Sequence, residues 1–254
     1  MILITGASSG IGEATAKAFA KLKQNLILIA RRIDRLEKLS QDIRIKYQVQ
    51  VIPFELDIRS KDAVLGIVKR NEELFSKTQV LVNNAGLAKG FERFPNCELS
   101  DWETMIDTNI KGLLYITKAV LPYMLKTNEG HIVNIGSIAG HWTYPHGNVY
   151  CATKSAVKAL TESLRMDLSG YSIRVTEISP GRVNTEFSEV RFGNKEKGRT
   201  AYEGFTPLES TDIAEAITWC VSRPKHVNVQ ELIIFPTDQA SVNLIHKKEK
   251  KRNS

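Results

Sequence analysis

The chain has 254 residues, of which 42% are hydrophobic and 25% charged. This composition excludes disordered, collagen-like and coiled-coil proteins and is typical of a globular protein that is large enough to bury its own core. The formal net charge is +7, but residues 247–254 hold five basic side chains and one acidic one, so residues 1–246 carry only +3. We therefore expect no nucleic-acid partner and a solvated, disordered basic tail over residues 247–254.

Cysteine and histidine positions argue against a metal site. Cys97, Cys151 and Cys220 lie far apart, and the five histidines show no ligand spacing. No run approaches the roughly 18 apolar residues that a membrane span needs. We expect a soluble, cytoplasmic protein without a bound metal or a membrane partner.

Short apolar runs alternate with amphipathic stretches along the chain. The runs are continuously apolar, as in Leu26-Ile27-Leu28-Ile29, which is typical of strands that helices cover on both faces. The predicted strands are residues 2–5, 25–30, 49–55, 80–83, 131–136, 174–179 and 231–235. The predicted helices are residues 13–23, 34–47, 61–75, 100–126, 149–168 and 211–222. This alternation predicts an α/β fold with a doubly wound, mostly parallel sheet.

No linker or internal repeat divides residues 1–246, so we expect one domain. Residues 185–206 interrupt the alternation, since they are polar and contain Gly193, Gly198 and Gly204. A long excursion after the C-terminal end of a strand lies where α/β sheets bind ligands, which makes this segment a candidate lid. The alternative is a passive surface insertion.

A glycine-rich turn follows the first predicted strand and leads directly into a helix. It reads Thr5-Gly6-Ala7-Ser8-Ser9-Gly10-Ile11-Gly12. Gly6 permits the tight turn, Gly10 lets the backbone approach a pyrophosphate, and Gly12 allows the helix to pack closely on the strand. With the amides of the helix N-terminus, the turn predicts a dinucleotide site rather than a bare structural turn.

The end of the second predicted strand indicates which dinucleotide binds. Arg31 and Arg32 stand there, whereas a cofactor with a free ribose 2′-hydroxyl usually meets an acidic residue. Guanidinium groups grip a phosphate through charge-assisted hydrogen bonds, so we expect NADP(H). The alternative is that the two arginines only begin a surface helix, with Arg32 or Arg35 pairing to Glu37 or Asp34.

Three side chains form a candidate catalytic group. Tyr150 and Lys154 are spaced i,i+4 on one predicted helix, which places them on the same face. A nearby ammonium group favours the ionised form of a phenol, so Tyr150 is a candidate to exchange a proton with a substrate oxygen. Ser137 follows the fifth predicted strand, at the same edge of the sheet as the glycine turn.

Together these segments resemble the short-chain dehydrogenase/reductase family over nearly the whole chain. The matching residues are Thr5-Gly6-x-x-x-Gly10-x-Gly12, Asn83-Asn84-Ala85-Gly86, Asn109, Ser137, Tyr150-x-x-x-Lys154 and Pro180-Gly181. The resemblance implies a single Rossmann-type domain with about seven strands, often assembled as a homotetramer. It also implies hydride transfer to or from a nicotinamide, in which Tyr150 exchanges the proton and Lys154 holds the nicotinamide ribose. Ser137 would then bind the substrate oxygen, and Asn109 would help to hold a proton-relaying water.

The resemblance further implies a set of cofactor contacts. These are Gly6, Ser8, Ser9, Gly10, Ile11, Gly12, Arg31, Arg32, Asp57, Ile58, Asn83, Ala85, Gly86, Tyr150, Lys154, Pro180, Gly181, Val183 and Thr185. In the family pattern Asp57 contacts the adenine, although an exposed carboxylate at a strand end is the alternative. Thr185 matches the position whose hydroxyl meets the carboxamide of the nicotinamide. Packing is the expected role of Asn84 and a further role of Ala85.

Local segments at 101–109, 147–150 and 185–192 resemble NADP-dependent 3-hydroxy acid dehydrogenases, which oxidise serine, allo-threonine and related acids. A carboxylate substrate needs a cation, and Arg191 in the candidate lid is our expected ligand, with Ser137 and Tyr150 binding the hydroxyl. Arg182 is the other choice, although it stands where this subfamily usually has an aliphatic residue. Either arginine has a plainer alternative as a surface partner of Glu186, Glu189 or Glu196. Trp142 and Tyr144 are expected in the pocket wall.

Other functions remain open from the sequence. A carbonyl, sugar or 3-oxoacyl reductase of the same family would not depend on Arg191. A catalytically silent nucleotide-binding protein would typically lack Tyr150 or Lys154, and both are present.

Overall fold

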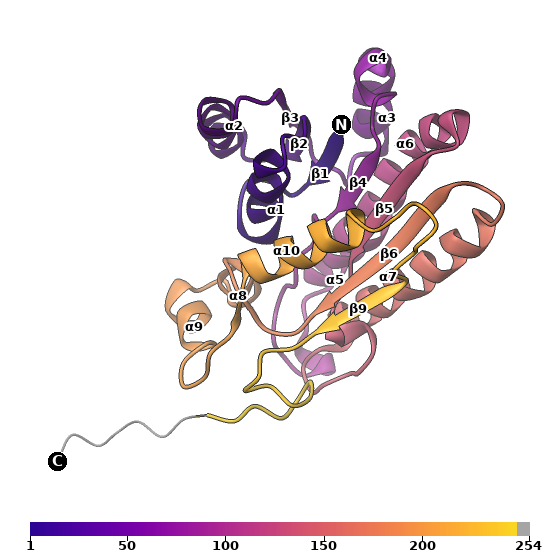
Figure 1. Cartoon of the computed structure of the whole chain (residues 1–254). Coiled ribbons are helices and arrows are strands. Elements are labelled where there is room, and N and C mark those ends of the chain that lie inside the picture. The colour runs from indigo at the N-terminus through magenta and orange to yellow at the C-terminus, as the bar shows by residue number, and fades with distance from the viewer. Residues whose placement is uncertain (248–254) are drawn as a thin grey trace.

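A seven-stranded parallel sheet forms the centre of the computed structural model, which describes residues 1–247. The strand order is β3-β2-β1-β4-β5-β6-β9 (Figure 1). The strands are β1 (Ile2–Thr5), β2 (Leu26–Ala30), β3 (Val51–Glu55), β4 (Val80–Asn83), β5 (Gly130–Ile135), β6 (Ile173–Pro180) and β9 (Glu231–Ile234). Every predicted strand is present within two residues of its expected ends, and the doubly wound α/β fold is confirmed. Apart from Lys247, the expected basic tail lies outside the described residues.

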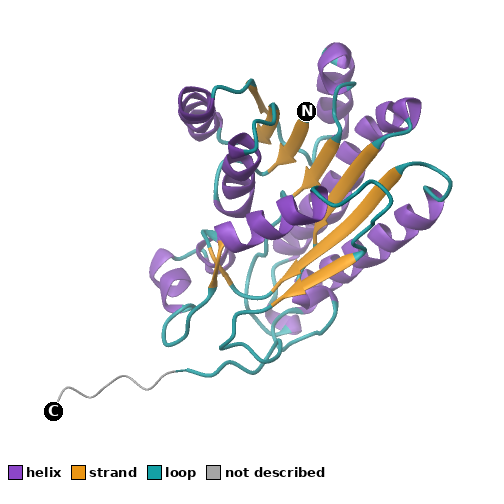
Figure 2. Cartoon of the chain, viewed as in Figure 1, coloured by secondary structure: helices purple, strands orange, loops and turns teal. Residues whose placement is uncertain are grey.

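Helices cover both faces of this sheet (Figure 2). On one face lie α1 (Gly10–Lys21), α2 (Ile33–Tyr47) and α10 (Ser210–Val221), and on the other lie α3 (Lys61–Arg70), α6 (Leu113–Thr127) and α7 (Asn148–Asp167). Because successive side chains of a strand point to opposite faces, Ile2 and Ile4 join the first core and Leu3 joins the second. The apolar runs of the sequence are therefore continuous because both faces are buried.

The predicted helices at 61–75 and 100–126 are each divided. Asn71 separates α3 from the short α4 (Glu72–Phe75). The longer one consists of α5 (Leu99–Ile106), a π-helical segment η2 (Asp107–Gly112) and α6. Single π turns inside α-helices occur mostly at functional sites, and this one contains Asn109.

The segment that interrupts the alternation is ordered into two short helices. They are α8 (Phe187–Phe192) and α9 (Lys195–Thr200), and they are flanked by a two-stranded parallel sheet of β7 (Val183–Asn184) and β8 (Leu208–Glu209). A Cβ atom at Gly198 would lie 2.6 Å from the Glu189 amide nitrogen, so glycine lets the two helices pack closely. Short 3-10 turns, η1 (Phe94–Asn96) and η3 (Ile138–Gly140), lie elsewhere at this end of the sheet.

The order of the strands reverses between β1 and β4. In open α/β sheets, ligands bind beyond the carboxyl ends of the strands at such a switch point. Within the described residues, no helix combines the length and the apolar character that crossing a membrane requires.

Candidate active site

A cavity of about 960 Å³ lies at the carboxyl ends of the strands. Its walls come from the turns that follow β1, β2, β4, β5 and β6 and from the segment at 185–206. Nearly all predicted site residues line it: Gly6, Ser8, Ser9, Gly10, Ile11, Arg31, Arg32, Asp57, Ile58, Ala85, Gly86, Ser137, Tyr150, Lys154, Pro180, Gly181, Val183, Thr185 and Arg191. Gly12, Asn83 and Asn109 are not in the lining. The volume suits an extended small-molecule ligand.

The turn between β1 and α1 depends on its glycines. Gly6 and Gly10 have φ angles of +65° and +56°, a region that other residues rarely adopt. A Cβ atom on Gly12 would lie 2.4 Å from the Gly6 carbonyl oxygen, so Gly12 serves close packing rather than ligand contact. Ser9 caps α1 without a side-chain hydrogen bond to the helix. The first amides of α1 thus face the cavity as a site for a pyrophosphate.

Arginines at the start of α2 form the far end of this cavity. Arg32 donates hydrogen bonds to the Ser8 hydroxyl at 3.2 Å and to the Ser9 hydroxyl at 2.6 Å. The Nη1 atoms of Arg32 and Arg35 donate to the two oxygens of the Glu186 carboxylate, at 2.8 and 2.6 Å respectively. The partner of both arginines is therefore a residue of the candidate lid, and not Glu37 or Asp34 as the surface-helix alternative supposes.

Asp57 lines the cavity at the end of β3, but its carboxylate is already paired. The Arg59 guanidinium binds both carboxylate oxygens, and the Arg59 amide donates to one of them at 3.0 Å. These hydrogen bonds from Arg59 hold the pKa of Asp57 below its usual value. Asp57 is therefore an ionised and fixed acceptor at the cavity wall.

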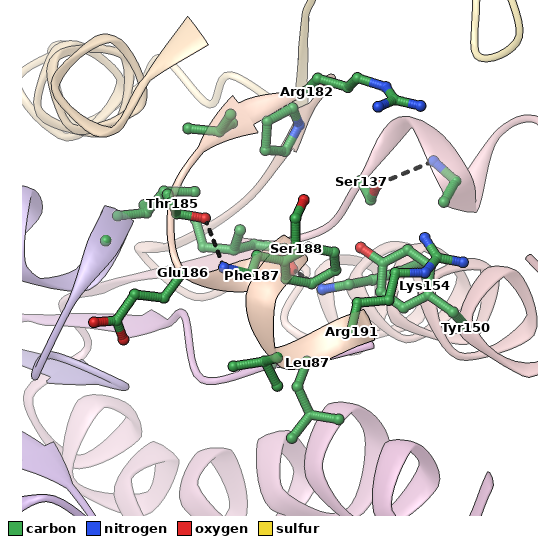
Figure 3. Close-up of a pocket in the computed structure, with 18 of the residues that line it drawn as sticks. Leu87, Ser137, Tyr150, Lys154, Arg182, Thr185, Glu186, Phe187, Ser188 and Arg191 are labelled. Carbon is green, nitrogen blue, oxygen red and sulfur yellow. Dashed lines mark hydrogen bonds between the residues drawn. The ribbon is translucent and has the colours of Figure 1, made fainter. Parts of the chain in front are cut away.

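Ser137, Tyr150 and Lys154 meet at the opposite end of the cavity (Figure 3). Ser137 caps the short η3 turn and accepts a hydrogen bond from the Ala139 amide at 3.1 Å. Lys154 is 6% exposed, and its Nζ donates to the Ile135 carbonyl at 2.8 Å. Ser137 and Lys154 are thereby both held by the backbone at the end of β5 and in the turn that follows it. The positions of Ser137, Tyr150 and Lys154 are therefore fixed by β5 and α7 together.

Burial dominates the acid–base properties of this group. It raises the pKa of Tyr150, while the nearby Ser137 hydroxyl and the Arg191 charge lower it. Burial also lowers the pKa of Lys154 to about 8. Arg191 is thus a cation beside Tyr150 that the i,i+4 spacing of Tyr150 and Lys154 does not reveal.

Asn109 holds backbone in place rather than facing the cavity. Its side-chain oxygen accepts from the Leu87 amide at 2.9 Å, and its nitrogen donates to the Leu87 carbonyl at 2.8 Å and the Thr153 hydroxyl at 3.0 Å. The side chain is 2% exposed, so its hydrogen-bonding groups are taken up by protein. This side chain therefore fixes the backbone of Leu87, which lines the cavity, and its part in holding a water stays a prediction.

Asn83 is also a buried structural residue. Its nitrogen donates to Thr117 and to Asn134, both at 2.9 Å, which ties β4 to α6 and β5. Asn84 instead lines the cavity, and its side chain binds the Thr5 and Gly6 carbonyls at 3.0 and 3.2 Å. Asn83 therefore stabilises the central sheet from the core, whereas Asn84, for which packing is expected, holds the glycine turn at the cavity.

Arg191 reaches from α8 into the catalytic end of the cavity. It donates to the Tyr144 hydroxyl at 2.7 Å and to the Gly90 and His146 carbonyls at 3.3 and 3.2 Å. Its guanidinium carbon lies 5.5 Å from the centre of the Tyr150 ring. Among the described residues, none of its hydrogen bonds goes to a carboxylate, so the surface pairing with Glu186, Glu189 or Glu196 is not what the structure shows.

The chain that leaves β6 brings the lid to the glycine turn. A Cβ atom on Gly181 would lie 2.7 Å from the Gln239 side-chain oxygen, which accepts the Arg182 amide at 2.9 Å. The Thr185 hydroxyl accepts the Phe187 amide at 3.2 Å, and its methyl group lies close to Gly10. Thr185 can therefore still donate its hydroxyl hydrogen into the cavity.

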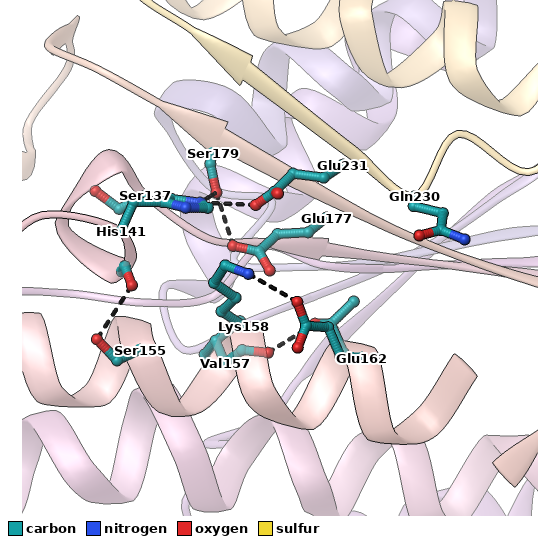
Figure 4. A network of polar contacts seen from close by, with 12 residues as sticks. Ser137, His141, Ser155, Val157, Lys158, Glu162, Glu177, Ser179, Gln230 and Glu231 are labelled. Atoms are coloured by element: carbon teal, nitrogen blue, oxygen red, sulfur yellow. Dashed lines mark hydrogen bonds and ion pairs between the residues drawn. The ribbon is translucent and has the colours of Figure 1, made fainter. Parts of the chain in front are cut away.

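A polar network supports the Ser137 turn from behind (Figure 4). The His141 Nε2 atom lies 2.7 Å from a Glu231 oxygen and 3.3 Å from the Ser179 hydroxyl, which donates to buried Glu177 at 2.7 Å. One nitrogen of His141 and one carboxylate oxygen each of Glu177 and Glu231 lie within 4.8 Å of one another, a proximity that sequence spacing does not reveal. The network joins the η3 turn to β6 and β9.

Two aromatic residues after Ser137 differ in position. Tyr144 lines the cavity and binds Arg191, as expected. Trp142 is 47% exposed and packs beside His141 and Phe235, so its expected place in the pocket wall is wrong.

Sequence reasoning missed Glu186 and also Phe187, whose ring centre lies 5.5 Å from that of Tyr150. No local pattern marks either residue.

The fold and cavity are typical of a dinucleotide-binding α/β protein, with Ser137, Tyr150 and Lys154 as the candidate catalytic group. Residues 1–196 match the family model described as short chain dehydrogenase. The chain is 42% identical over 250 residues to an NADP-dependent 3-hydroxy acid dehydrogenase of Schizosaccharomyces pombe, covering 98% of this chain and 96% of that protein. It is 45% identical over 242 residues to sulfoacetaldehyde reductase 2 of Chromohalobacter salexigens, covering 94% and 95%.

A solved structure agrees with these relatives. The closed form of a serine dehydrogenase complexed with NADP+ has a TM-score of 0.90 and 40% identity, over 98% of this chain and 99% of that one. The chain belongs to the short-chain dehydrogenase family.

Proposed function

We propose that this protein is an NADP-dependent dehydrogenase of short 3-hydroxy acids such as 3-hydroxybutyrate, serine and allo-threonine. The observation that carries the proposal is Arg191, a cation held beside Tyr150 with no acidic partner among the described residues. A carboxylate bound there would place a hydroxyl on the third carbon near Tyr150. The names and similarity of the relatives support the same substrate class.

The cofactor site supports NADP(H). Gly6 and Gly10 leave room for a pyrophosphate at the first amides of α1. Arg31, Arg32 and Arg35 supply cationic donors for a 2′-phosphate, with the Ser8 and Ser9 hydroxyls beside them. NADP+ held by these residues would supply the hydride acceptor for the carbon that carries the substrate hydroxyl.

The residues of the chain orient the substrate and move its proton. Ser137 and Tyr150 bind the substrate oxygen, and Tyr150 takes its proton during oxidation and returns it during reduction. Lys154 holds the nicotinamide ribose, and its positive charge favours the tyrosinate. Arg191 binds the carboxylate and lowers the pKa of Tyr150. The cavity fixes these groups in one arrangement, which removes the entropic cost of bringing them together.

A second candidate is reduction of a short aldehyde that carries a sulfonate. The relative named sulfoacetaldehyde reductase 2 favours it, because a sulfonate would bind the same Arg191 cation. A catalytically silent protein is disfavoured by the intact Ser137, Tyr150 and Lys154 group. We further propose a homotetramer in the cytoplasm, supported by the family resemblance and by the three unpaired cysteines.

The test is the change in absorbance at 340 nm when purified protein meets NADP+ or NAD+ with 3-hydroxybutyrate, serine, allo-threonine or 2-propanol. We expect turnover of the acids with NADP+, loss of turnover in Tyr150→Phe with NADPH binding retained, and a KM at least tenfold higher in Arg191→Leu. Turnover of 2-propanol alone would overturn the substrate class. Gel filtration tests the tetramer.

A further inference from the structure

A second arginine, Arg182, lines the cavity from the chain that follows β6, whereas Arg191 comes from α8. The Nη1 atom of Arg182 donates to the Ala201 carbonyl at 3.0 Å, and its guanidinium lies 6.0 Å from the centre of the Phe205 ring. In the described part of the chain, no carboxylate binds this guanidinium. The expected surface pairing of Arg182 is therefore not observed.

The two guanidinium groups act on each other. In Figure 3, Arg182 and Arg191 lie on opposite sides of Ser137, with Tyr150 beside Arg191. Burial lowers the pKa of Arg182, Tyr202 and Tyr144 oppose this shift, and the Arg191 charge adds to the lowering. Two like charges that line one cavity repel each other in the empty protein, and a bound anion relieves that repulsion.

The acidic residues of the cavity do not compensate these charges. Asp57 and Glu186 are the carboxylates among the described lining residues, and both lie toward the cofactor end. Asp57 is paired with Arg59, and Glu186 with Arg32 and Arg35. Lys197 and Lys247 add further positive charge to the lining. The charged lining residues that lack an acidic partner among the described residues are therefore cations.

One substrate carboxylate matches only one of these cations. A carboxylate on Arg191 leaves Arg182 across the catalytic group without a counter-charge. Arg182 is also held in place, because its backbone amide binds Gln239 and its side chain binds Ala201. A second anionic group on the same molecule, on the other side of the reacting carbon, would reach it.

We propose that the preferred substrate is a dianion: a short 3-hydroxy acid whose carboxylate binds Arg191 and whose second anionic group binds Arg182. This inference rests on the proposed function and narrows its substrate class. The reaction balances as for the monoacid. The dianion loses a hydride from its hydroxyl-bearing carbon to NADP+ and the hydroxyl proton to Tyr150, and it leaves as the 3-oxo dianion.

The experiment compares probes that differ only at the far end. 3-Hydroxyglutarate carries a second carboxylate, 3-hydroxybutyrate lacks it, and the monomethyl ester of 3-hydroxyglutarate keeps the length without the charge. With NADP+, we expect kcat/KM for 3-hydroxyglutarate to exceed the other two at least tenfold. Arg182→Leu should reduce that ratio to about one, whereas Arg182→Lys should keep part of it. Arg199→Leu is the matched control, since Arg199 lies on α9 outside the cavity lining.

The outcomes separate this inference from the proposed function. If 3-hydroxybutyrate is oxidised but the second carboxylate gives no advantage, or the advantage survives Arg182→Leu, the dianion proposal is overturned and the proposed function stands. If no 3-hydroxy acid is oxidised, the proposed function fails first. A weaker NADPH affinity in Arg182→Leu, with an unchanged substrate ratio, would assign Arg182 to the cofactor and also overturn the proposal.

Discussion

The Glu186 carboxylate accepts a hydrogen bond from the Arg32 guanidinium at 2.8 Å, joining the candidate lid to the start of α2. Arg32 also binds Ser8 and Ser9 of the glycine turn, and Arg35 shares the same carboxylate at 2.6 Å. An acidic side chain thus lies where the proposed function places the 2′-phosphate of NADP(H). Because both anions need the same donors, Glu186 and the phosphate compete for them.

Glu186→Gln should therefore bind NADP+ more tightly than the wild-type protein. The two ion pairs with Glu186 are substantially exposed to solvent, so together they contribute at most ~2 kcal/mol and the gain in affinity is about thirtyfold or less. The dissociation constant for NAD+, which has no 2′-phosphate, should change little. Titration calorimetry with both cofactors measures this, and Glu189→Gln on the same helix is the control. Weaker NADP+ binding would mean that Glu186 helps to hold the cofactor.

Arg31 and Arg32 should decide between the two cofactors. Replacing Arg31 by Asp and Arg32 by Ala removes two cations and introduces a carboxylate that suits a free 2′-hydroxyl. Loss of hydrogen bonds to a charged group costs about 1.5–3 kcal/mol, which corresponds to at least a tenfold loss in NADP+ affinity. Comparing kcat/KM for NADP+ and NAD+ measures the shift. An unchanged ratio would place the phosphate elsewhere.

The sequence predicts the sheet because each strand carries a local signal. Both faces of β2 are buried, so Leu26-Ile27-Leu28-Ile29 is apolar at every position. The proximity of the candidate catalytic residues is also predictable, because Tyr150 and Lys154 are spaced one turn apart and Ser137 follows a strand directly. Local patterns were sufficient wherever the physical cause lies within a few residues.

Contacts between distant segments could not be predicted in this way. Arg32 and Glu186 are separated by 154 positions, and the approach of Arg191 to Tyr144 depends on how α8 packs. The π-helical segment contains Asn109, whose side chain bonds to Leu87 on another segment. Periodicity along the helix carries no information about such a partner.

Asn83→Ala should reduce stability without weakening cofactor binding. The substitution leaves the buried Asn134 oxygen and Thr117 hydroxyl without their partner, which costs about 1–3 kcal/mol. Asn83 lies outside the cavity lining, so the NADPH dissociation constant of the folded variant should stay within about twofold of wild type. Urea unfolding and fluorescence titration measure the two quantities. Unchanged stability with weaker NADPH binding would return Asn83 to the cofactor site.

The buried positive charge of Lys154 should lower the free energy of unfolding at neutral pH. Burial lowers its pKa from 10.5 to about 8, and the charge of Glu177 only partly opposes this shift. Below pH 8 the folded and unfolded states both hold the proton, so the folded state carries the full cost of the buried cation. Between pH 8 and 10.5 the unfolded chain binds more protons, so this cost disappears as the pH rises.

Lys154→Met keeps the aliphatic length and removes the charge. At pH 7 we expect the variant to be more stable than wild type by up to ~3 kcal/mol, less the value of the lost hydrogen bond to Ile135. Urea unfolding at pH 7 and pH 9.5 should show this difference shrinking with rising pH. Lys158→Met, at a partly exposed lysine of the same helix that pairs with Glu162, should show no such decrease. A pH-independent difference would mean that the pKa of Lys154 is the same in the folded and unfolded states. The positive charge of Lys154 that favours the tyrosinate would then be present at all working pH values.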